Sequence, residues 1–300
     1  MKRRYVTVDV FTDKVFGGNP LAVVLDAEGL STAQMQSIAT EFNYSETTFV
    51  LAPQNLAHTA HVRIFTARVE VPFAGHPNVG TAVVLARELE SAGHRPVDQF
   101  LFEEAAGLVP VRLIRSAGIV VAAELTTPKA LSVGASVSVE DAAASLSLTP
   151  ADICTAAHLP QVLSVGLPFL VVEVTSRDAL RRARPNALVH ERILPPIGTD
   201  AVFAYARGAT CGELHARVFA PMDASPEDPA TGSANAAAIA MLAGLHPLVN
   251  GELAWRIEQG VDMGRPSLLL GRTEKRGGEV TAVRIAGNAV PVMHGVLQID

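Results

Sequence analysis

Hydrophobic and polar residues alternate along several stretches of the chain, and this alternation predicts β-strands. Residues 5–11 alternate in this way, and residues 44–51 are rich in β-branched and aromatic side chains. Residues 108–114 and 119–125 flank a turn at residues 116–118 and predict a hairpin. The first part of the chain is therefore expected to be rich in strands.

Two kinds of helix are predicted among these strands. Ser31 and Gln34 form a capping-box pattern, and the apolar residues that follow recur at helical spacing, so this helix should bury one face. Residues 81–85 and 234–242 are apolar nearly all round. Because such helices offer no face suited to water, both should lie buried inside the protein.

The second half of the sequence repeats landmarks of the first in the same order, about 150 residues later. The matches are Pro20–Val24 with Pro168–Val172, Glu46–Phe49 with Asp200–Phe203, Arg63–Phe65 with Arg217–Phe219, Pro77 with Pro229 and Gly80 with Gly232, and Gly107 with Gly260. They indicate an internal duplication, with a pseudo-twofold axis and a cleft between the halves. We expect an N-terminal half over residues 1–127 and a C-terminal half over residues 128–300, whose last strand, residues 293–299, could pack on either half.

Two turns of the repeat lead into the buried helices. A proline follows His76 and Asp228, which predicts that each of these residues caps a helix. Gly80 and Gly232 would then lie in the first turns, where glycine costs about 1 kcal/mol relative to alanine and allows close approach of a ligand or of the other half. The N–H groups of such helix starts could bind a carboxylate. The alternative is two capped core helices that bind nothing.

Three residues are candidates for acid–base chemistry. Glu46 begins a buried-looking strand, a position that disfavours glutamate, so it is either a locally paired rim carboxylate or a partly desolvated group that transfers a proton. His76 is either a helix cap or a hydrogen-bonding or acid–base partner. Asp200, which the repeat matches to Glu46, is either a second acid–base group or a turn residue after Gly198.

Composition narrows the class of protein. The 300 residues are 49% hydrophobic and 18% charged, enough for a large core, while a net charge of -6 and 5% aromatic residues do not favour nucleic-acid binding. No apolar run approaches a membrane span, and the two cysteines form no CxxC motif. We therefore expect a cytoplasmic protein without a membrane or nucleic-acid partner. Neither metal-ligand spacing nor a nucleotide-binding fingerprint is present, so no metal site is expected.

The motifs taken together resemble the PhzF family, the phenazine-biosynthesis isomerases and their relatives, over almost the full chain. The matching motifs are Asp9–Thr12 with Gly18–Val24, Ser45–Thr47, Phe73–Pro77, Glu227–Ala234, and Gln259–Gly260 with Met263–Ser267. The resemblance implies an α+β, diaminopimelate-epimerase-like fold of two pseudo-symmetric halves, each a curved, mostly antiparallel sheet wrapped round a central helix. It also implies a homodimer that needs no cofactor.

The resemblance further implies roles for individual residues. Glu46 would take and return the proton, with His76 and Asp228 in support, and Gly232 and Ser233 would contact the substrate carboxylate. We also expect Asn19, Gly75 and Gly80 to contact substrate. The related epimerases use two cysteines at the helix-start turns, whereas Cys154 and Cys211 lie elsewhere, which argues against a two-thiol mechanism.

The predicted function is a cofactor-independent isomerase that moves a proton on a small carboxylate-bearing substrate. It would resemble the phenazine enzyme, which isomerises trans-2,3-dihydro-3-hydroxyanthranilate. Two alternatives stay open at this point. One is an amino-acid or hydroxy-acid epimerase or racemase that pairs Glu46 with Asp200 or Asp228. The other is a non-catalytic protein that binds a small metabolite.

Overall fold

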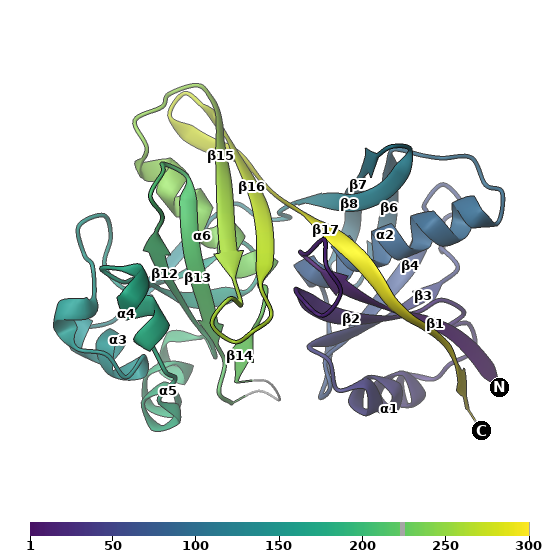
Figure 1. The fold of residues 1–300 in the computed structure, drawn as a ribbon, viewed down its shortest axis with the longest axis horizontal. Helices are drawn as coiled ribbons and strands as arrows, with labels where there is room; N and C mark the ends of the chain where they lie inside the picture. The colour runs from purple at the N-terminus through teal and green to yellow at the C-terminus, as the bar shows by residue number, and fades with distance from the viewer. Residues whose placement is uncertain (223–225, 300) are drawn as a thin grey trace. The chain divides into compact units, whose positions relative to one another are not determined.

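The computed structural model describes residues 1–222 and 226–299, and the chain divides into two compact units (Figure 1). Unit 1 comprises Met1–Thr126 with Ala286–Asp300, and unit 2 comprises Thr127–Ile285. The long strand β17 (Glu279–Gln298) therefore belongs to both units. Within the described residues, no helix is both long and apolar enough to cross a membrane.

Unit 1 is a closed sheet around a helix. Its elements are β1 (Lys2–Val10), β2 (Asn19–Val24), α1 (Thr32–Phe42), β3 (Glu46–Leu51), β4 (Ala60–Phe65), β5 (Glu70–Val71), α2 (Gly75–Ser91), β6 (Gln99–Glu104), β7 (Gly107–Ser116), β8 (Ile119–Thr126) and the end of β17. Neighbours pair antiparallel except β2 with β3 and β4 with β6, which are parallel. Because β17 pairs with both β1 and β8, the sheet closes on itself in the manner of a barrel.

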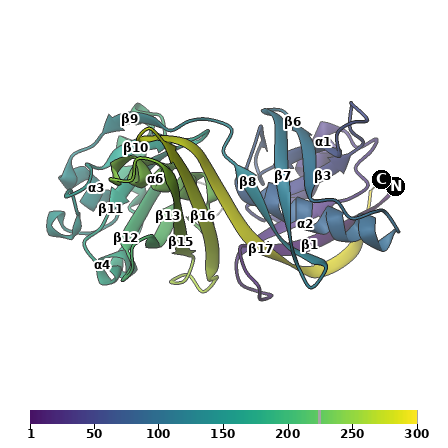
Figure 2. The same ribbon diagram turned by 90° about the horizontal axis from the view of Figure 1, so that it is seen from above.

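The two helices of unit 1 differ as the sequence predicts. On α1, the Ser31 hydroxyl and the Gln34 side chain form the expected capping box, and Met35 and Ala39 pack into a core cluster with Phe49. On α2, every residue from His76 to Ala86 is buried. Figure 2 shows α2 among the strands of its unit. The all-round apolar pattern therefore marks the central helix of the closed sheet.

Unit 2 has its own strands and a second buried helix. Its elements are β9 (Ser132–Ser136), α3 (Val139–Ser145), η1 (Pro150–Asp152), β10 (Gln161–Ser164), β11 (Pro168–Glu173), α4 (Arg177–Arg182), α5 (Ala187–Ile193), η2 (Pro195–Ile197), β12 (Val202–Arg207), β13 (Glu213–Phe219), β14 (Glu227–Asp228), α6 (Gly232–Leu245), β15 (Gly251–Gln259), β16 (Ser267–Arg276) and the start of β17. The run from Ala234 to Ala243 on α6 is buried, again as predicted.

The pairings of unit 2 follow the order found in unit 1. The pair β11–β12 is parallel like β2–β3, β13 pairs antiparallel with β12 and β14, and β13–β15 is parallel like β4–β6. The helices α3, α4 and α5 pack against β11 and β12 through a second core cluster that includes Leu146, Leu180 and Leu194.

The C-terminal strand supplies the outer neighbour of the N-terminal strand. The register runs from Lys2 opposite Gln298 to Val10 opposite Ala289, with a bulge between Thr7 and Val8. Residues 286–299 thus make their contacts in unit 1, whereas the sequence had left the partner of residues 293–299 open.

Both buried helices begin away from the predicted positions. Helix α2 begins at Gly75 with Ala74 at its N-cap, so His76 is a helical residue and Pro77 lies in the first turn, where its missing N–H is also tolerated. Helix α6 begins at Gly232 with Thr231 at its N-cap. The predicted cap, Asp228, instead belongs to β14, because its pairing with Val218 holds it extended.

The strand registers also differ from the residue matches predicted between the first and second halves of the sequence. Phe65 lies opposite Glu70 and Phe219 opposite Glu227, and each short strand is followed after the same interval by a helix start, at Gly75 and Gly232. Gly75, not Gly80, is therefore the counterpart of Gly232. Thr47 and Val202 lie opposite the same two phenylalanines, so Glu46 corresponds to Ala201 rather than to Asp200.

Candidate active site

Glu46 and His76 meet in unit 1. Glu46 is the first residue of β3, opposite Leu21 of β2, and its side chain is 19% exposed. His76 lies in the first turn of α2 and is 5% exposed. The distance between Glu46 Oε2 and His76 Nδ1 is 3.3 Å. The structure therefore joins two of the three residues predicted to be catalytic.

The environment of His76 determines its charge. Burial lowers the pKa of the imidazole from 6.5 to about 3, and a hydrogen bond to the Pro20 backbone opposes that shift only in part. His76 is consequently neutral near neutral pH, and its 3.3 Å approach to Glu46 Oε2 is a polar contact rather than a charged pair. Ala74, not His76, is the N-cap of α2, and whether His76 acts on substrate as an acid–base group or as a hydrogen-bonding partner stays a prediction.

Neighbouring polar residues fix the strand and the helix that carry the pair. Thr48 on β3 and Thr81 on α2 are both fully buried, and their hydroxyl groups lie 2.8 Å apart. Asn19, the first residue of β2, is also fully buried. Because β2 and β3 are parallel, Asn19 and Glu46 lie near the same ends of these strands.

The two predicted glycines of unit 1 have different surroundings. Gly75 is the first residue of α2, whereas Gly80 lies in its second turn. A Cβ atom at Gly80 would lie 2.6 Å from Leu21 Cδ2 and 2.7 Å from Val10 Cγ2. The close approach predicted for Gly80 is therefore one between the helix and the sheet of its own unit.

Asp228 is held at the start of α6 in unit 2. The Thr231 hydroxyl donates to the Asp228 carboxylate, and the Gln259 amide donates to the Asp228 carbonyl at 2.8 Å. Gln259 also accepts from the Thr231 N–H at 3.1 Å, which satisfies a group at the helix start. Gly232 and Ser233 follow as the first two residues of the helix.

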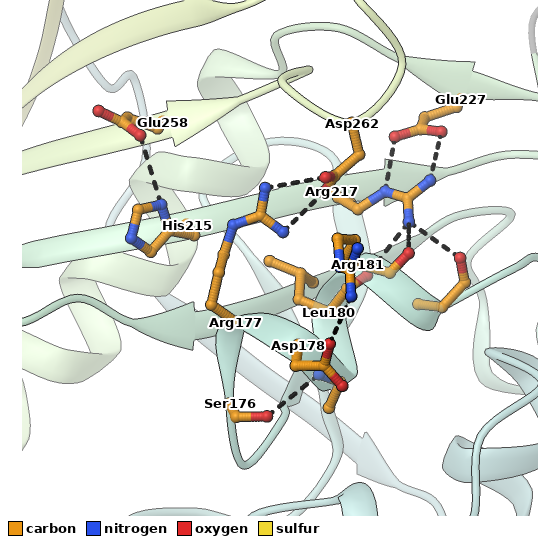
Figure 3. Close-up of polar contacts among 12 residues, drawn as sticks. Ser176, Arg177, Asp178, Leu180, Arg181, His215, Arg217, Glu227, Glu258 and Asp262 are labelled. Atoms are coloured by element: carbon orange, nitrogen blue, oxygen red, sulfur yellow. Dashed lines mark hydrogen bonds and ion pairs between the residues drawn. The ribbon is translucent and has the colours of Figure 1, made fainter.

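A buried arginine fixes the strand that carries Asp228. Arg217 on β13 makes two hydrogen bonds of 2.8 Å to Glu227, the residue before Asp228. Its other terminal nitrogen donates to the carbonyl groups of Leu180 and Ala183, at 3.1 and 2.9 Å, near the end of α4. Figure 3 shows the guanidinium group between Glu227 and these carbonyl groups. One side chain thus ties together β13, β14 and α4.

Three of these positioning residues were missed by reasoning from the sequence. Gln259 stands in a recognised motif and Arg217 in a recognised repeat, but neither pattern indicates a role for the residue. Asn235, which donates to the Thr231 carbonyl at 2.9 Å, had not been singled out at all. A polar residue inside an otherwise apolar helix was the available signal for Asn235.

The remaining predicted groups lie outside these contacts. Asp200 is exposed and precedes β12. Cys154 is half-buried and Cys211 exposed, and neither begins α2 or α6. Among residues 1–222 and 226–299, no group of three or more His, Cys, Asp or Glu side chains is arranged to hold a metal ion.

Comparison with known proteins matches the chain along nearly its whole length. The family model of phenazine biosynthesis-like proteins, PhzC-PhzF, matches residues 8–295. An uncharacterized isomerase of Mesorhizobium japonicum is 39% identical, with 99% of each chain covered. A trans-2,3-dihydro-3-hydroxyanthranilate isomerase of Pseudomonas chlororaphis is 36% identical, with 98% of each chain covered.

Solved structures support the same grouping. A phenazine biosynthesis protein of the PhzF family from Bacillus anthracis has a TM-score of 0.87 at 26% identity, with 100% of both chains covered. A hydroxyproline epimerase from Agrobacterium vitis has a TM-score of 0.64 at 13% identity, over 99% of this chain and 92% of the other, a likeness of fold alone. The expected resemblance and the α+β fold class are confirmed at this level.

Proposed function

The chain belongs to the PhzC-PhzF family of phenazine biosynthesis-like proteins and is an isomerase, and from this premise we propose that Glu46 is its proton-transferring residue. The observation that carries the proposal is the 3.3 Å contact of Glu46 with a buried, neutral His76. A neutral imidazole beside the carboxylate adds no positive charge, so Glu46 stays able to accept a proton.

The proposed reaction moves one proton within one molecule. The Glu46 carboxylate accepts a proton from a carbon next to an activating group, and the electron pair of that C–H bond shifts into the conjugated system. The resulting carboxylic acid then protonates another carbon, which moves the double bond and restores the carboxylate. Every proton and electron pair is conserved, so the step requires no co-reactant.

Residues of both units have proposed roles in binding. Asn19 and Gly75 in unit 1 would contact the substrate, whereas the buried Gly80 packs against Leu21 and Val10 of its own unit. In unit 2, the first N–H groups of α6, at Gly232 and Ser233, suit a carboxylate because a helix start carries unpaired donors and positive potential. Asp228 would complete the acid–base set. The cleft expected between the halves stays a prediction.

Substitution of Glu46 by glutamine tests the central role. We propose trans-2,3-dihydro-3-hydroxyanthranilate, the substrate named for relatives, as the first compound to assay in deuterated water. Glu46→Gln should reduce deuterium incorporation and isomerisation by roughly 100-fold or more. Glu41→Gln, which changes an exposed acid on α1, is the matched control. Deuterium exchange at the wild-type rate in Glu46→Gln would remove Glu46 from the mechanism.

The stereochemistry of the product separates the isomerase from an epimerase. An isomerase of this kind moves a double bond, whereas an epimerase inverts one carbon. Glu46 corresponds in register to Ala201, and Asp200 is exposed, so the structure offers no support for a pairing of Glu46 with Asp200. Inversion without movement of a double bond across a panel of small carboxylic acids would favour the epimerase instead.

We infer that the two units descend from one duplicated module. The shared order of strand pairings supports this, as do the paired interactions Arg63 with Glu70 and Arg217 with Glu227. Arg63 lies over the Phe65 ring at 5.2 Å, and Arg217 lies over the Phe219 ring at 4.6 Å. The two units differ from the halves expected from the sequence, because residues 286–299 belong to unit 1 and not to the C-terminal half.

We also propose a cytoplasmic homodimer. All five residues of β9, which pairs with β10, are exposed and uncharged, so this edge could be extended by a strand from a second copy. Sedimentation equilibrium should give twice the mass of the chain, and a monomer at micromolar concentration would contradict the dimer. Cell fractionation tests the location.

A further inference from the structure

Glu104 is a buried acid that the proposed reaction does not use. It is the last residue of β6 and is 8% exposed. Both of its carboxyl oxygens are buried, and neither has a hydrogen-bond partner within the part of the chain that the structure describes. The Asn78 amide of α2 lies beside the carboxyl group, although no hydrogen bond of ordinary length joins them.

Gln259 occupies the corresponding place in unit 2. It is the last residue of β15, as Glu104 is of β6, and it is fully buried. Its amide nitrogen donates to the Asp228 carbonyl at 2.8 Å and to the Thr231 hydroxyl at 3.0 Å. Its amide oxygen accepts from the Thr231 N–H at 3.1 Å and from Asn235 at 2.7 Å. Gln259 thus both donates and accepts at the start of α6.

The helix starts that these two side chains meet are alike. Asn78 is the fourth residue of α2 and donates to the carbonyl of its N-cap residue Ala74 at 3.0 Å. Asn235 is the fourth residue of α6 and donates to the carbonyl of its N-cap residue Thr231 at 2.9 Å. The turn after β6 also contacts the approach to α2, because the Ala106 N–H donates to the Pro72 carbonyl at 3.1 Å.

We propose that Glu104 is held as a neutral carboxylic acid and positions the start of α2, including His76, as Gln259 positions the start of α6. A protonated carboxyl group matches an amide, since it has one donor and one acceptor, whereas a carboxylate only accepts. The O–H group of a protonated Glu104 has an acceptor available in Asn78 Oδ1, which is buried and lacks a hydrogen-bond partner among the described residues. The positioning of His76 by Glu104 rests on the proposed function, whereas the protonation of Glu104 does not.

The electrostatics agree with this assignment. Burial raises the pKa of Glu104 from its ordinary value of 4.5 to about 8, and the Asn78 amide opposes that shift. A cavity of about 580 Å³ adjoins this corner of unit 1. The titratable and charged side chains that line this cavity beside Glu104 are His61 and Arg63 of β4, Glu70 of β5, Glu103 of β6 and His58 of the loop before β4. His76 is a buried residue of the first turn of α2.

Two of the nearby basic side chains, Arg63 and His58, are paired with other acids, and no ion pair to Glu104 is found among the described residues. Arg63 is paired with Glu70 at 2.7 Å, and His58 is paired with Glu103 at 2.7 Å. His76 is neutral because its own pKa is lowered to about 3. An ionised Glu104 would therefore be a buried charge without compensation, which the protein avoids by keeping the proton.

The pH dependence of stability tests the protonation without substrate. A raised pKa in the folded state means that stability is full below the unfolded-state pKa and falls as pH rises through the folded-state pKa, here between 4.5 and about 8. In Glu104→Gln this loss should disappear. Between pH 5 and about 9, the Tm of the wild type should fall by roughly 4 °C or more relative to Glu104→Gln.

Glu103→Gln is the matched control on the same strand. Glu103 accepts from the backbone N–H groups of Gln54 and Asn55, which lower its pKa to about 2. This substitution should shift the Tm without changing its slope between pH 5 and about 9. Parallel profiles of wild type and Glu104→Gln over that range would overturn the proposal.

Infrared spectroscopy observes the proton directly. The difference spectrum of wild type minus Glu104→Gln at pH 6 should contain the C=O stretch of a protonated carboxyl group, and its absence would overturn the proposal. If Glu104→Gln does not fold, Gln259→Glu provides the reciprocal test. It should be stable at pH 5 and lose Tm as the pH rises; a profile identical in slope to the wild type would refute the equivalence.

The positioning role has its own measurement. In the wild type, the ring resonances of His76 should shift as the pH rises from 6 to about 9, because Glu104 ionises, and in Glu104→Gln they should stay constant. Constant resonances in both proteins would refute positioning of His76. These experiments use no substrate, so their failure leaves the role of Glu46 standing, and failure of the Glu46→Gln test leaves the protonation of Glu104 standing.

Discussion

A single histidine shows how burial decides a chemical role. By type, His76 could be an acid, a base or a cap, but a side chain that is 5% exposed with a pKa lowered to about 3 does not carry charge near neutral pH. In the proposed mechanism proton transfer therefore falls to Glu46, which is more exposed and lies 3.3 Å from His76. Under this proposal Glu46 moves the proton and the neutral His76 lies beside it.

Acid titration should reveal the neutral His76. A lowered folded-state pKa means that stability is present above the unfolded-state pKa of 6.5 and is lost as pH falls toward about 3. Between pH 6.5 and 4 the free energy of unfolding of the wild type should fall by roughly 3 kcal/mol more than that of His76→Gln. Urea unfolding across this range measures the difference.

His61→Gln is the control for that titration. His61 lies on β4 with its side chain half-buried. Its replacement should leave the acid-dependent loss in place, because the loss originates in the fully buried ring of His76. The same slope in wild type and His76→Gln would show that His76 is charged or accessible to water.

At the scale of the element, the closeness of α2 to its sheet rests on one glycine. Gly80→Ala places a Cβ atom 2.6 Å from Leu21 and 2.7 Å from Val10, so it should destabilise the protein by about 1–3 kcal/mol. Gly244→Ala on α6 is the opposite case. A Cβ atom there meets nothing within 4 Å, and the substitution should stabilise the helix by about 0.5–1 kcal/mol. Chemical denaturation measures both.

The junction of β13, β14 and α4 depends on Arg217. Arg217→Met would leave Glu227 half-buried without its partner and should lower the free energy of unfolding by about 3 kcal/mol. Arg63→Met in unit 1 is the comparison, because Arg63 and Glu70 are 20% and 33% exposed and their pair should contribute about 1 kcal/mol or less. Equal losses in the two variants would show that burial does not set the difference.

Individual helices and strands were easier to predict from the sequence than the matching of residues in unit 1 with residues in unit 2. The capping box at Ser31 and the apolar helices are local patterns, and the structure confirms them. The match of Pro77 with Pro229 was wrong because Pro-x-x-Gly occurs twice in succession, over residues 72–75 and 77–80. Only the pairing of the short strands decides between the two, and strand pairing is not a local property of the sequence.

The site was predictable where a motif carried it and not where support came from a distance. Glu46 and His76 stand in recognised motifs, and the structure brings them together. Gln259 and Arg217 act through hydrogen bonds to residues about 30 positions away along the chain, which no spacing in the sequence signals. No motif in the sequence singles out Glu104, and only its burial in the structure distinguishes it from other charged residues.

At the scale of the whole molecule, the division into units differs from a simple halving of the chain. The C-terminal residues pair with β1, so unit 1 consists of two separate segments. Removal of residues 289–300 should leave one edge of β1 unpaired. It should also expose the core cluster beside α1, against which Leu297 and Ile299 pack. We expect the truncated chain to lose the cooperative unfolding transition of unit 1.

Circular dichroism during thermal unfolding tests this truncation. Val296→Thr, which alters an exposed position of the same strand, is the control and should unfold like the wild type. A truncated protein with an unchanged transition would show that the last strand is dispensable for unit 1.

The pairing of the two termini also sets an order on biosynthesis. Strand β1 precedes unit 2 in the sequence, yet it receives its second neighbour, besides β2, only after residues 289–298 have been synthesised. Unit 2 is contiguous in sequence and can finish its own sheet earlier. The pairing of β1 is therefore completed only after unit 2 has been made, and until then the nascent chain carries an open strand edge that a chaperone, or a wrong partner, can reach.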